Sequence, residues 1–294
     1  MSNISAKLVK ELREKTGAGM MECKNALQET EGDIEKAIDF LRTRGLAALN
    51  KKADRATNEG AIAEYISVDS KTGVLIEVNC ETDFVSSNAT FTSFVKLLAE
   101  VVADENPIDA DALMKLSVPN RDITIEELFG ETVGKLGENI RVARFERIEL
   151  TDTAALSAYI HGGARIGIMV QFKLGKQETA DKEVFKIFAR DVAMQVAAAN
   201  PIAVRQESFD PAIIEKEKEI YKAQAAESGK PENIQEMMAQ GRLKKFFKEQ
   251  ALVEQAYVKD MDISIDDYTK RVAKEVGDTI EIEAFTRYDL GSSA

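Results

Sequence analysis

Side chains for catalysis and metal binding are scarce in this sequence. Its 294 residues include one histidine, His161, and two cysteines, Cys23 and Cys80. The cysteines have neither C-x-x-C spacing nor the companion ligands of a zinc site, and so few thiols are typical of a reducing compartment. No hydrolase triad, H-E-x-x-H motif, P-loop or complete dinucleotide fingerprint is found. We therefore expect no catalytic residue, no metal site and no cofactor.

Long apolar runs and an excess of positive charge are also missing. No stretch of roughly 18 uncharged apolar residues occurs, and the chain does not start with a basic segment followed by an apolar one. These absences predict a cytoplasmic protein without membrane spans. Acidic residues number 51 and basic residues 39, so the formal charge of −12 opposes nucleic acid as a direct partner. A hydrophobic content of 44% suits two or three domains.

The first 50 residues predict a module of three short helices. Ser5 can cap the first helix, and the second runs over about residues 20–30. Asp33 can cap the third helix, which Gly45 is expected to end as a C′ glycine. The polar and charged residues 51–59 predict a linker with a domain boundary in it.

Residues 60–150 combine strand and helix patterns in one α+β subdomain. The expected strands are 61–68, 73–79 and 140–150, and the expected helices are 88–103 and 124–136. The same unit then recurs. Tyr159-Ile160 lies 94 positions after Tyr65-Ile66, and Gly277 lies 140 positions after Gly137 in a second matching block. The difference between these offsets predicts an insertion of 46 residues in the second copy.

The insertion has the pattern of two antiparallel helices that form a protruding arm over residues 210–254. Asp210-Pro211 starts one helix, Pro231 starts the other, and apolar residues at three-to-four spacing can seal the pair. The second subdomain is therefore expected to comprise residues 151–209 and 255–294. Three lysines of the arm, Lys244, Lys245 and Lys248, either contact RNA or form a solvated helix face, and the acidic composition favours the second.

One segment of the first copy has no counterpart in the second. After the matched strands the first copy continues with Thr82-Asp83-Phe84-Val85, where the second has Lys176-Gln177-Glu178-Thr179. A carboxylate beside an aromatic ring at a strand-to-helix junction can project as an acidic, apolar tip that fills a pocket of a partner. Alternatively Phe84 is a core residue and Asp83 an ordinary helix cap, which these residues alone favour.

Three glycines near the histidine, at positions 162, 163 and 167, invite comparison with a phosphate-binding loop. They align with the turn of the first hairpin and do not open a helix, so a structural turn is expected.

Four blocks of this sequence together resemble bacterial translation elongation factor Ts. They are residues 8–21 (LVKELREKTGAGMM), 77–85 (EVNCETDFV), 161–167 (HGGARIG) and 236–246 (EMMAQGRLKKF). The blocks keep their order and are spread over nearly the whole chain. The resemblance implies a guanine nucleotide exchange factor for elongation factor Tu. It also implies a UBA-like N-terminal module, similar to ubiquitin-associated domains, a two-part core and a coiled-coil hairpin.

The resemblance also implies roles for particular residues. Thr82, Asp83, Phe84 and Val85 would enter the GTPase domain of elongation factor Tu and dislodge its magnesium ion, and they need not bind the metal themselves. Arg13, Met20 and Met21 match a second contact surface on that domain, although one methionine could instead pack inside the module. His161, Gly162 and Arg165 match a segment that faces another domain, but the family differs from this chain at Gly163.

The C-terminus, the hairpin and the function each allow a further expectation. Many family members continue into a C-terminal helix that touches the partner, so the end at Ala294 predicts a smaller interface. The hairpin either pairs with a second copy of the chain or contacts only the partner. The alternatives to an exchange factor are a non-catalytic scaffold or chaperone, and, more remotely, an enzyme of unknown type.

Overall fold

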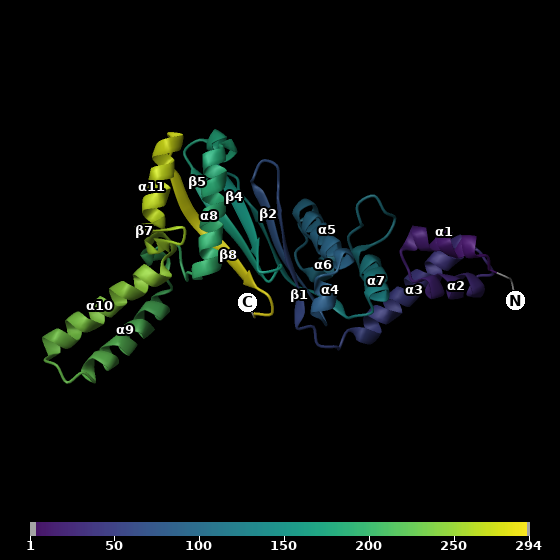
Figure 1. Ribbon diagram of the computed structural model, residues 1–294, viewed down its shortest axis with the longest axis horizontal. Helices are drawn as coiled ribbons and strands as arrows, with labels where there is room; N and C mark the ends of the chain where they lie inside the picture. The colour runs from purple at the N-terminus through teal and green to yellow at the C-terminus, as the bar shows by residue number, and fades with distance from the viewer. Residues whose placement is uncertain (1–3, 293–294) are drawn as a thin grey trace.

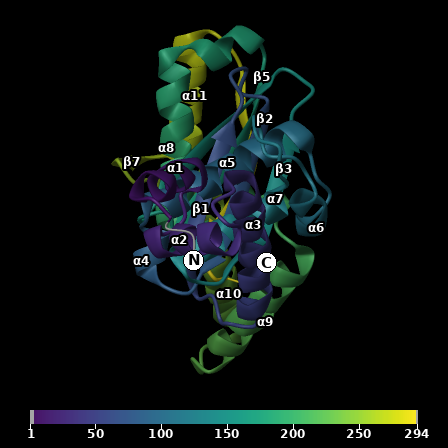
Figure 2. The same cartoon turned by 90° about the vertical axis from the view of Figure 1, so that its right-hand side faces the viewer.

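The computed structural model describes residues 4–292 and has an elongated α+β fold (Figure 1). A three-helix module lies at one end, two small sheets with their covering helices lie in the middle, and a two-helix arm extends from the other end. Viewed along the long axis, the module lies in front of the core and the arm extends downwards (Figure 2).

The N-terminal module consists of α1 (Ala6–Thr16), α2 (Met20–Glu29) and α3 (Ile34–Lys52). Ser5 and Asp33 cap α1 and α3 as expected, because each side chain accepts a hydrogen bond from a backbone N–H of the first turn. Gly17 ends α1 with a left-handed φ of 69°. The module has its own small core, formed by Val9, Leu12, Cys23, Ala26, Leu27 and Ala37.

The expectation that Gly45 ends the third helix was wrong. The helix continues for seven residues beyond Gly45 and ends at Lys52. Gly45 is buried inside the helix, where it faces Gly130 of the core helix α7 (Ile125–Leu136). Its role is therefore close helix packing, which a C′ glycine does not provide.

The first sheet has the antiparallel order β1-β2-β3, formed by β1 (Glu59–Ile66), β2 (Thr72–Cys80) and β3 (Ile140–Glu149). Helix α5 (Ala89–Glu105) covers one face, and its buried Phe94 meets Phe129 of α7 edge to face at 4.7 Å. Two shorter helices, α4 (Asp83–Ser86) and α6 (Ala110–Met114), lie in the connections.

The second sheet repeats this order as β4-β5-β8, formed by β4 (Ala154–His161), β5 (Ile166–Leu174) and β8 (Ile280–Asp289). Helices α8 (Glu183–Ala199) and α11 (Ile265–Val276) pack on it. A two-stranded ribbon, β6 (Ala256–Tyr257) and β7 (Asp260–Ser264), precedes α11. Short 3-10 helices are η1 (Gln177–Asp181), η2 (Gln206–Ser208) and η3 (Leu252–Glu254).

The structure confirms the internal duplication in its main helices and strands. Helices α5 and α8 have the same length and start 94 positions apart, while α7 and α11 have the same length and start 140 positions apart. Even the strand register shifts at matching places, after Glu77 in the first sheet and after Gln171 in the second.

The two sheets pack against each other through matching residues of the two copies. Ile62, Ile66, Leu75, Ile148 and Leu150 of the first copy meet their counterparts Leu156, Ile160, Met169, Tyr288 and Leu290. Backbone hydrogen bonds are reciprocal too, since Ile62 N donates to Ala164 O and Leu156 N donates to Ser70 O. The core therefore has helix, sheet, sheet and helix layers related by an approximate twofold axis.

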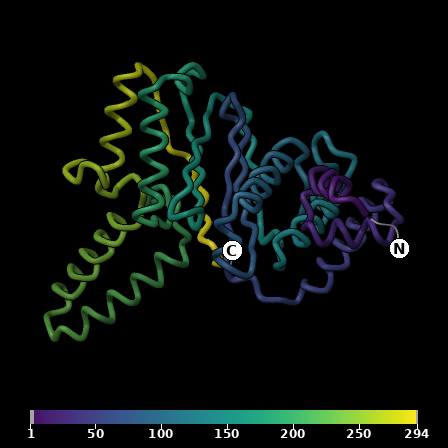
Figure 3. The backbone as a smooth tube through the Cα atoms, turned by 45° about the vertical axis from the view of Figure 1, so that its right-hand side comes forward, coloured from purple at the N-terminus to yellow at the C-terminus, as the bar shows by residue number. Residues whose placement is uncertain are grey.

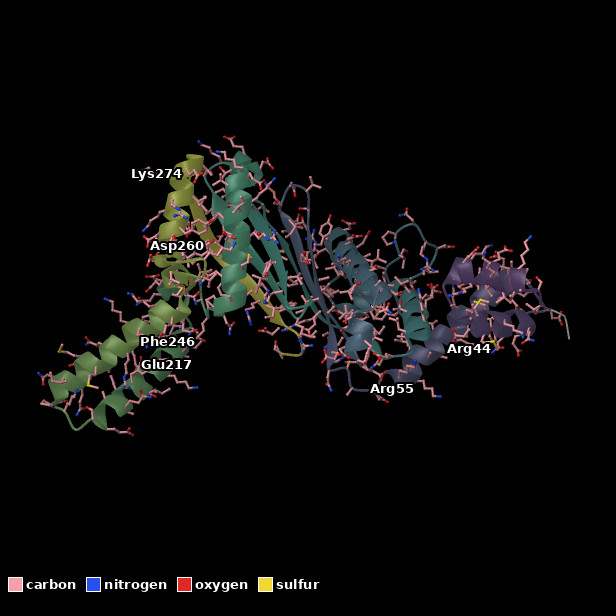
Figure 4. The ribbon with its side chains drawn as sticks, viewed as in Figure 1. Arg44, Arg55, Glu217, Phe246, Asp260 and Lys274 are labelled. Atoms are coloured by element: carbon pink, nitrogen blue, oxygen red, sulfur yellow. The ribbon has the colours of Figure 1, made fainter. Side chains whose placement is uncertain are left out.

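The inserted arm is an antiparallel pair of helices, α9 (Pro211–Ala226) and α10 (Glu232–Gln250). Figure 3 shows it leaving the second sheet at the end farthest from the N-terminal module. Asp210 and Pro211 start α9 as expected, and Pro231 precedes α10. At the base of the arm Phe246, labelled in Figure 4, packs with Phe209 and Phe247. This aromatic cluster joins the arm to the second half of the core.

Candidate partner-binding surface

The loop after β2 presents an aromatic ring to solvent. Thr82 caps the four-residue helix α4 by accepting from Val85 N at 3.4 Å. Phe84 is 85% exposed, whereas Val85 is 8% exposed and belongs to the first core cluster. The alternative in which Phe84 is a core residue and Asp83 the cap is therefore wrong. Val85 anchors the loop, and Asp83 and Phe84 project from it.

A carboxylate from a distant part of the chain holds the base of this loop. Glu138, the second residue after α7, accepts hydrogen bonds from Glu81 N at 3.1 Å and from Thr82 N at 3.0 Å through Oε2. Its Oε1 accepts from Thr82 Oγ1 at 2.6 Å. A carboxylate with three such donors fixes the backbone from which Phe84 projects.

The neighbouring Glu81 makes the reverse contact. Its Oε1 accepts from Asn139 N at 2.6 Å and from Arg55 Nη1 at 3.3 Å. The backbone hydrogen bond from Asn139, followed by the contact with Arg55, holds the pKa of Glu81 below its usual value. Glu138 thus holds the backbone N–H groups of Glu81 and Thr82, while Glu81 holds that of Asn139, across the end of the sheet.

The thiol beneath the loop is not a reactive group. Cys80 is fully buried, and its Sγ lies 3.2 Å from Thr82 O. Burial, followed by the nearby charge of Glu138, raises the pKa of the Cys80 thiol to about 12. A thiol that stays protonated at neutral pH is a poor nucleophile, so Cys80 serves as packing.

The second copy keeps the carboxylate but lacks the projecting ring. Asp278, the counterpart of Glu138, accepts from Lys176 N at 2.9 Å and from Thr179 Oγ1 at 2.6 Å. The held segment forms η1, and its residues Thr179 and Ala180 are buried. The same scaffold therefore supports an exposed phenylalanine in one copy only.

The N-terminal module presents a second apolar surface. Met20 is 49% exposed and Met21 is 65% exposed, at the start of α2, and Arg13 on α1 is exposed as well. The alternative in which one methionine packs inside the module is therefore wrong. Flexible thioether side chains on a surface adapt readily to a binding partner.

The turn between β4 and β5 carries the third group of expected residues. His161, Gly162 and Arg165 are all exposed there, and Tyr159 OH lies 3.0 Å from His161 Nδ1. Gly162 and Gly163 have φ of 62° and 66°, which identifies them as hairpin-turn residues, as expected. Arg165 Nη1 contacts Glu59 Oε2 at 2.5 Å, and Glu59 pairs with Cys80 in the first sheet. The turn thus lies at the same end of β1 as the Phe84 loop.

Comparison with known proteins identifies the family. Residues 81–292 match the family model described as "Elongation factor TS". The elongation factor Ts of Clostridium novyi (strain NT) is 45% identical over 289 residues, which cover 98% of this chain and 93% of the relative. Those of Clostridium kluyveri (strain ATCC 8527) and Clostridium perfringens (strain SM101) are 46% and 47% identical, with the same coverage.

This chain belongs to the elongation factor Ts family. The family match begins at Glu81, so it includes the clamp and the loop with Phe84. Among residues 4–292, no three histidine, cysteine, aspartate or glutamate side chains are grouped as metal ligands would be. Within the same residues, no helix is long and apolar enough to cross a membrane.

The supporting residues Glu81, Glu138 and Asn139 were missed by sequence reasoning. The sequence does mark the position of Glu138, because residues 137–140 recur as residues 277–280 with a carboxylate at the second position of both blocks. The contact itself joins positions 56 residues apart, and nothing in the local pattern pairs them.

Proposed function

We propose that this protein is a guanine nucleotide exchange factor for elongation factor Tu in translation elongation. It binds the GDP complex of that protein and promotes GDP release, so that GTP can bind. The observation that carries this proposal is the exposed Phe84, on a loop clamped by Glu138, in a chain of the elongation factor Ts family. The role implies a cytoplasmic location, where translation takes place.

The proposed loop acts by displacement. Phe84 enters an apolar pocket of the GTPase domain, and Asp83 beside it disturbs the region of the bound magnesium and nucleotide. Thr82 and Val85 keep the tip in place, since Thr82 bonds to Glu138 and Val85 is buried in the core. An aromatic anchor held in its binding conformation loses little conformational entropy on association. No bond is broken in the partner, so the protein is not an enzyme in that sense.

Exchange then follows from thermodynamic linkage. A protein that binds nucleotide-free elongation factor Tu more tightly than the GDP complex must weaken GDP binding by the same free energy. Neither direct nucleic-acid binding nor a cofactor is needed for this step.

Two further contacts belong to the proposal. Arg13, Met20 and Met21 form one surface on the N-terminal module, and His161, Gly162 and Arg165 form another beside β1. The proposed domains are a UBA-like module (1–50), a linker (51–59), a first core subdomain (60–150), a second core subdomain (151–209 and 255–294) and a coiled-coil hairpin (210–254).

A release assay tests the function directly. Elongation factor Tu is loaded with fluorescent GDP, and this protein is added in substoichiometric amount with excess unlabelled nucleotide. We expect wild type to accelerate GDP release and Phe84→Ala to lose at least about 30-fold in kcat/KM, the loss for an anchor worth about 2 kcal/mol. Asp83→Ala is tested in parallel.

Val68→Ala is the matched control, because Val68 is an exposed apolar side chain in the β1–β2 turn. It should leave the rate unchanged. If wild type binds elongation factor Tu without accelerating release, the protein is a scaffold or chaperone and the exchange function is rejected. If wild type is active and both loop variants match it, only the loop assignment is rejected.

A further inference from the structure

One helix belongs to two hydrophobic cores. The first half of α3 contributes Ala37 and Ile38 to the core of the N-terminal module, while Ala48 and Leu49 near its end pack on the first core subdomain. The helix has 19 residues, which corresponds to about 28 Å of continuous helix. Figure 3 shows this helix connecting the module to the core without a break.

The second half of α3 crosses α7 at a pair of glycines. A Cβ atom on Gly45 would lie 2.8 Å from the backbone C and O atoms of Gly130. A Cβ atom on Gly130 would lie 2.9 Å from Gly45 C and Leu46 N. The two backbones therefore touch at this point, and only glycine at both positions allows the helices to approach so closely.

The end of α7 continues this connection to the Phe84 loop. Glu138 holds the loop, and Asn139 Nδ2 donates to Ala53 O at 3.1 Å and to Arg55 O at 2.9 Å. The side chain of Asn139 is 2% exposed, so these bonds are shielded from water. Figure 4 labels Arg44, which precedes Gly45 on α3, and Arg55, which lies in the segment after α3. One connected framework thus joins the module, the segment after α3 and the loop.

From this framework we propose that the crossing of α3 and α7 at Gly45 and Gly130 is a positioning element. It holds the Met20 and Met21 surface at a fixed place relative to Phe84, so that both surfaces engage the partner together. This inference rests on the proposed exchange function. Gly45 and Gly130 are positioning residues and make no contact with the partner themselves.

A fixed module should bind the partner more tightly than a mobile one, because its orientation is already set before binding. Two surfaces held in their binding arrangement act as one, because the second contact forms without a further loss of rigid-body freedom. If the module moved freely, the same contacts would form from a broad range of orientations. The KM for the GDP complex would then rise, while kcat, which depends on the Phe84 loop, would change little.

Helix α7 supplies its own control. Gly134 lies one turn after Gly130, and a Cβ atom there would have no atom within 4 Å. Alanine is the better helix former at either position, so Gly134→Ala should be neutral or slightly stabilising. Any loss in Gly130→Ala or Gly45→Ala therefore comes from the crossing. Asn139→Ala frees the segment after α3 by a second route, without adding any atom at the crossing.

The arrangement is measured without the partner by a spin-label distance between Glu29→Cys on α2 and Glu100→Cys on α5 in the full chain. Both positions are exposed, whereas the native Cys23 and Cys80 are fully buried and stay unlabelled. Wild type and Gly134→Ala should give one narrow distance distribution. Gly130→Ala, Gly45→Ala and Asn139→Ala should broaden it while circular dichroism shows the fold retained.

The exchange assay, carried out on unlabelled protein, then tests whether the position of the module affects binding of the partner. The three variants should raise KM by about tenfold and change kcat by less than about twofold. A narrow, unshifted distribution in all three overturns the positioning role. Broad distributions with an unchanged KM overturn its link to binding. If wild type shows no exchange at all, the proposed function fails, and the distance result still decides whether the crossing fixes the module.

Discussion

Thr82 and Glu138 are joined by a hydrogen bond of 2.6 Å between Oγ1 and Oε1, across 56 positions of sequence. The same carboxylate accepts from two backbone N–H groups of the loop. This contact couples the end of α7 to the segment that carries Phe84. The orientation of an exposed ring is thus set by a residue that never reaches the surface tip.

Replacement of Glu138 tests this clamp. Glu138→Gln leaves a single side-chain oxygen as acceptor, whereas the three donors of the loop bond to two carboxylate oxygens in wild type. The loop should therefore lose its fixed orientation. We expect the free energy of unfolding to fall by about 1–3 kcal/mol and kcat of nucleotide exchange to fall by about tenfold. Urea denaturation and fluorescent GDP release measure the two effects.

Asp278→Asn is the matched change in the second copy. Asp278 holds Lys176 N and Thr179 Oγ1 in the same way, but its segment carries no exposed ring. It should lower stability comparably and leave exchange unchanged. Equal losses of exchange in both variants would show that general destabilisation, and not the loop, is responsible.

Glu81 makes the stability of this region depend on pH. Its pKa is lowered, mainly by the hydrogen bond from Asn139 N. The stabilisation is complete above the unfolded pKa of about 4.3 and is lost as pH falls through the lower folded pKa. Urea titrations between about pH 6 and pH 3 should therefore show a smaller acid-induced loss in Glu81→Gln than in wild type. Glu100→Gln, on the exposed side of α5, should follow wild type, and parallel curves for all three proteins would refute the assignment.

The two sheets can be probed at their closest approach. Gly73 and Gly167 are counterparts in the duplication, and each faces the opposite copy. A Cβ atom on Gly73 would lie 2.7 Å from Sδ of Met169 and 2.8 Å from Cδ1 of Leu156, both at the far ends of flexible side chains. One on Gly167 would overlap Cγ2 of the stiff, β-branched Ile62. Gly167→Ala should lower the free energy of unfolding by about 1–3 kcal/mol, and Gly73→Ala should cost less.

Thermal and urea unfolding of the two variants measure this difference. Gly241→Ala on α10, with no atom near its Cβ position, provides the reference for an added methyl group. A larger loss for Gly73→Ala than for Gly167→Ala would mean that Met169 and Leu156 do not move aside as the flexibility of their side chains implies.

Periodicity and capping residues predicted most elements well, because helices and strands follow local rules. Ser5, Asp33 and Asp210 cap the helices they were expected to cap. The duplication was also readable from spacing, since matching blocks occupy matching strands. The prediction for Gly45 was wrong because glycine occurs both at helix ends and where two helices cross closely. Only the contact with Gly130 shows which of the two applies here.

Phe84 shows the limit of local reasoning most clearly. The residues around Phe84 favoured a core position for its side chain. The ring is exposed because Val85 packs in the core and Glu138 fixes the backbone of the loop. The ion pair between Glu77 and Arg144 also joins residues that are distant in the sequence. The two side chains meet at 2.9 Å and are 67 positions apart, and the second copy has Gln171 and Ala284 at the matching positions. Arg144 also donates to Asp289 O and so ties the end of β8 to the first sheet.

The sequence by itself determined most of the longer helices and strands, the repeated unit and the place of the inserted arm, because each depends on residues close together along the chain. Only the tertiary structure decided which side of the Thr82 to Val85 loop faces solvent, how α3 joins the module to the core and how the two copies pack. Those outcomes depend on hydrogen bonds and close contacts between distant segments, whose partners no local pattern names.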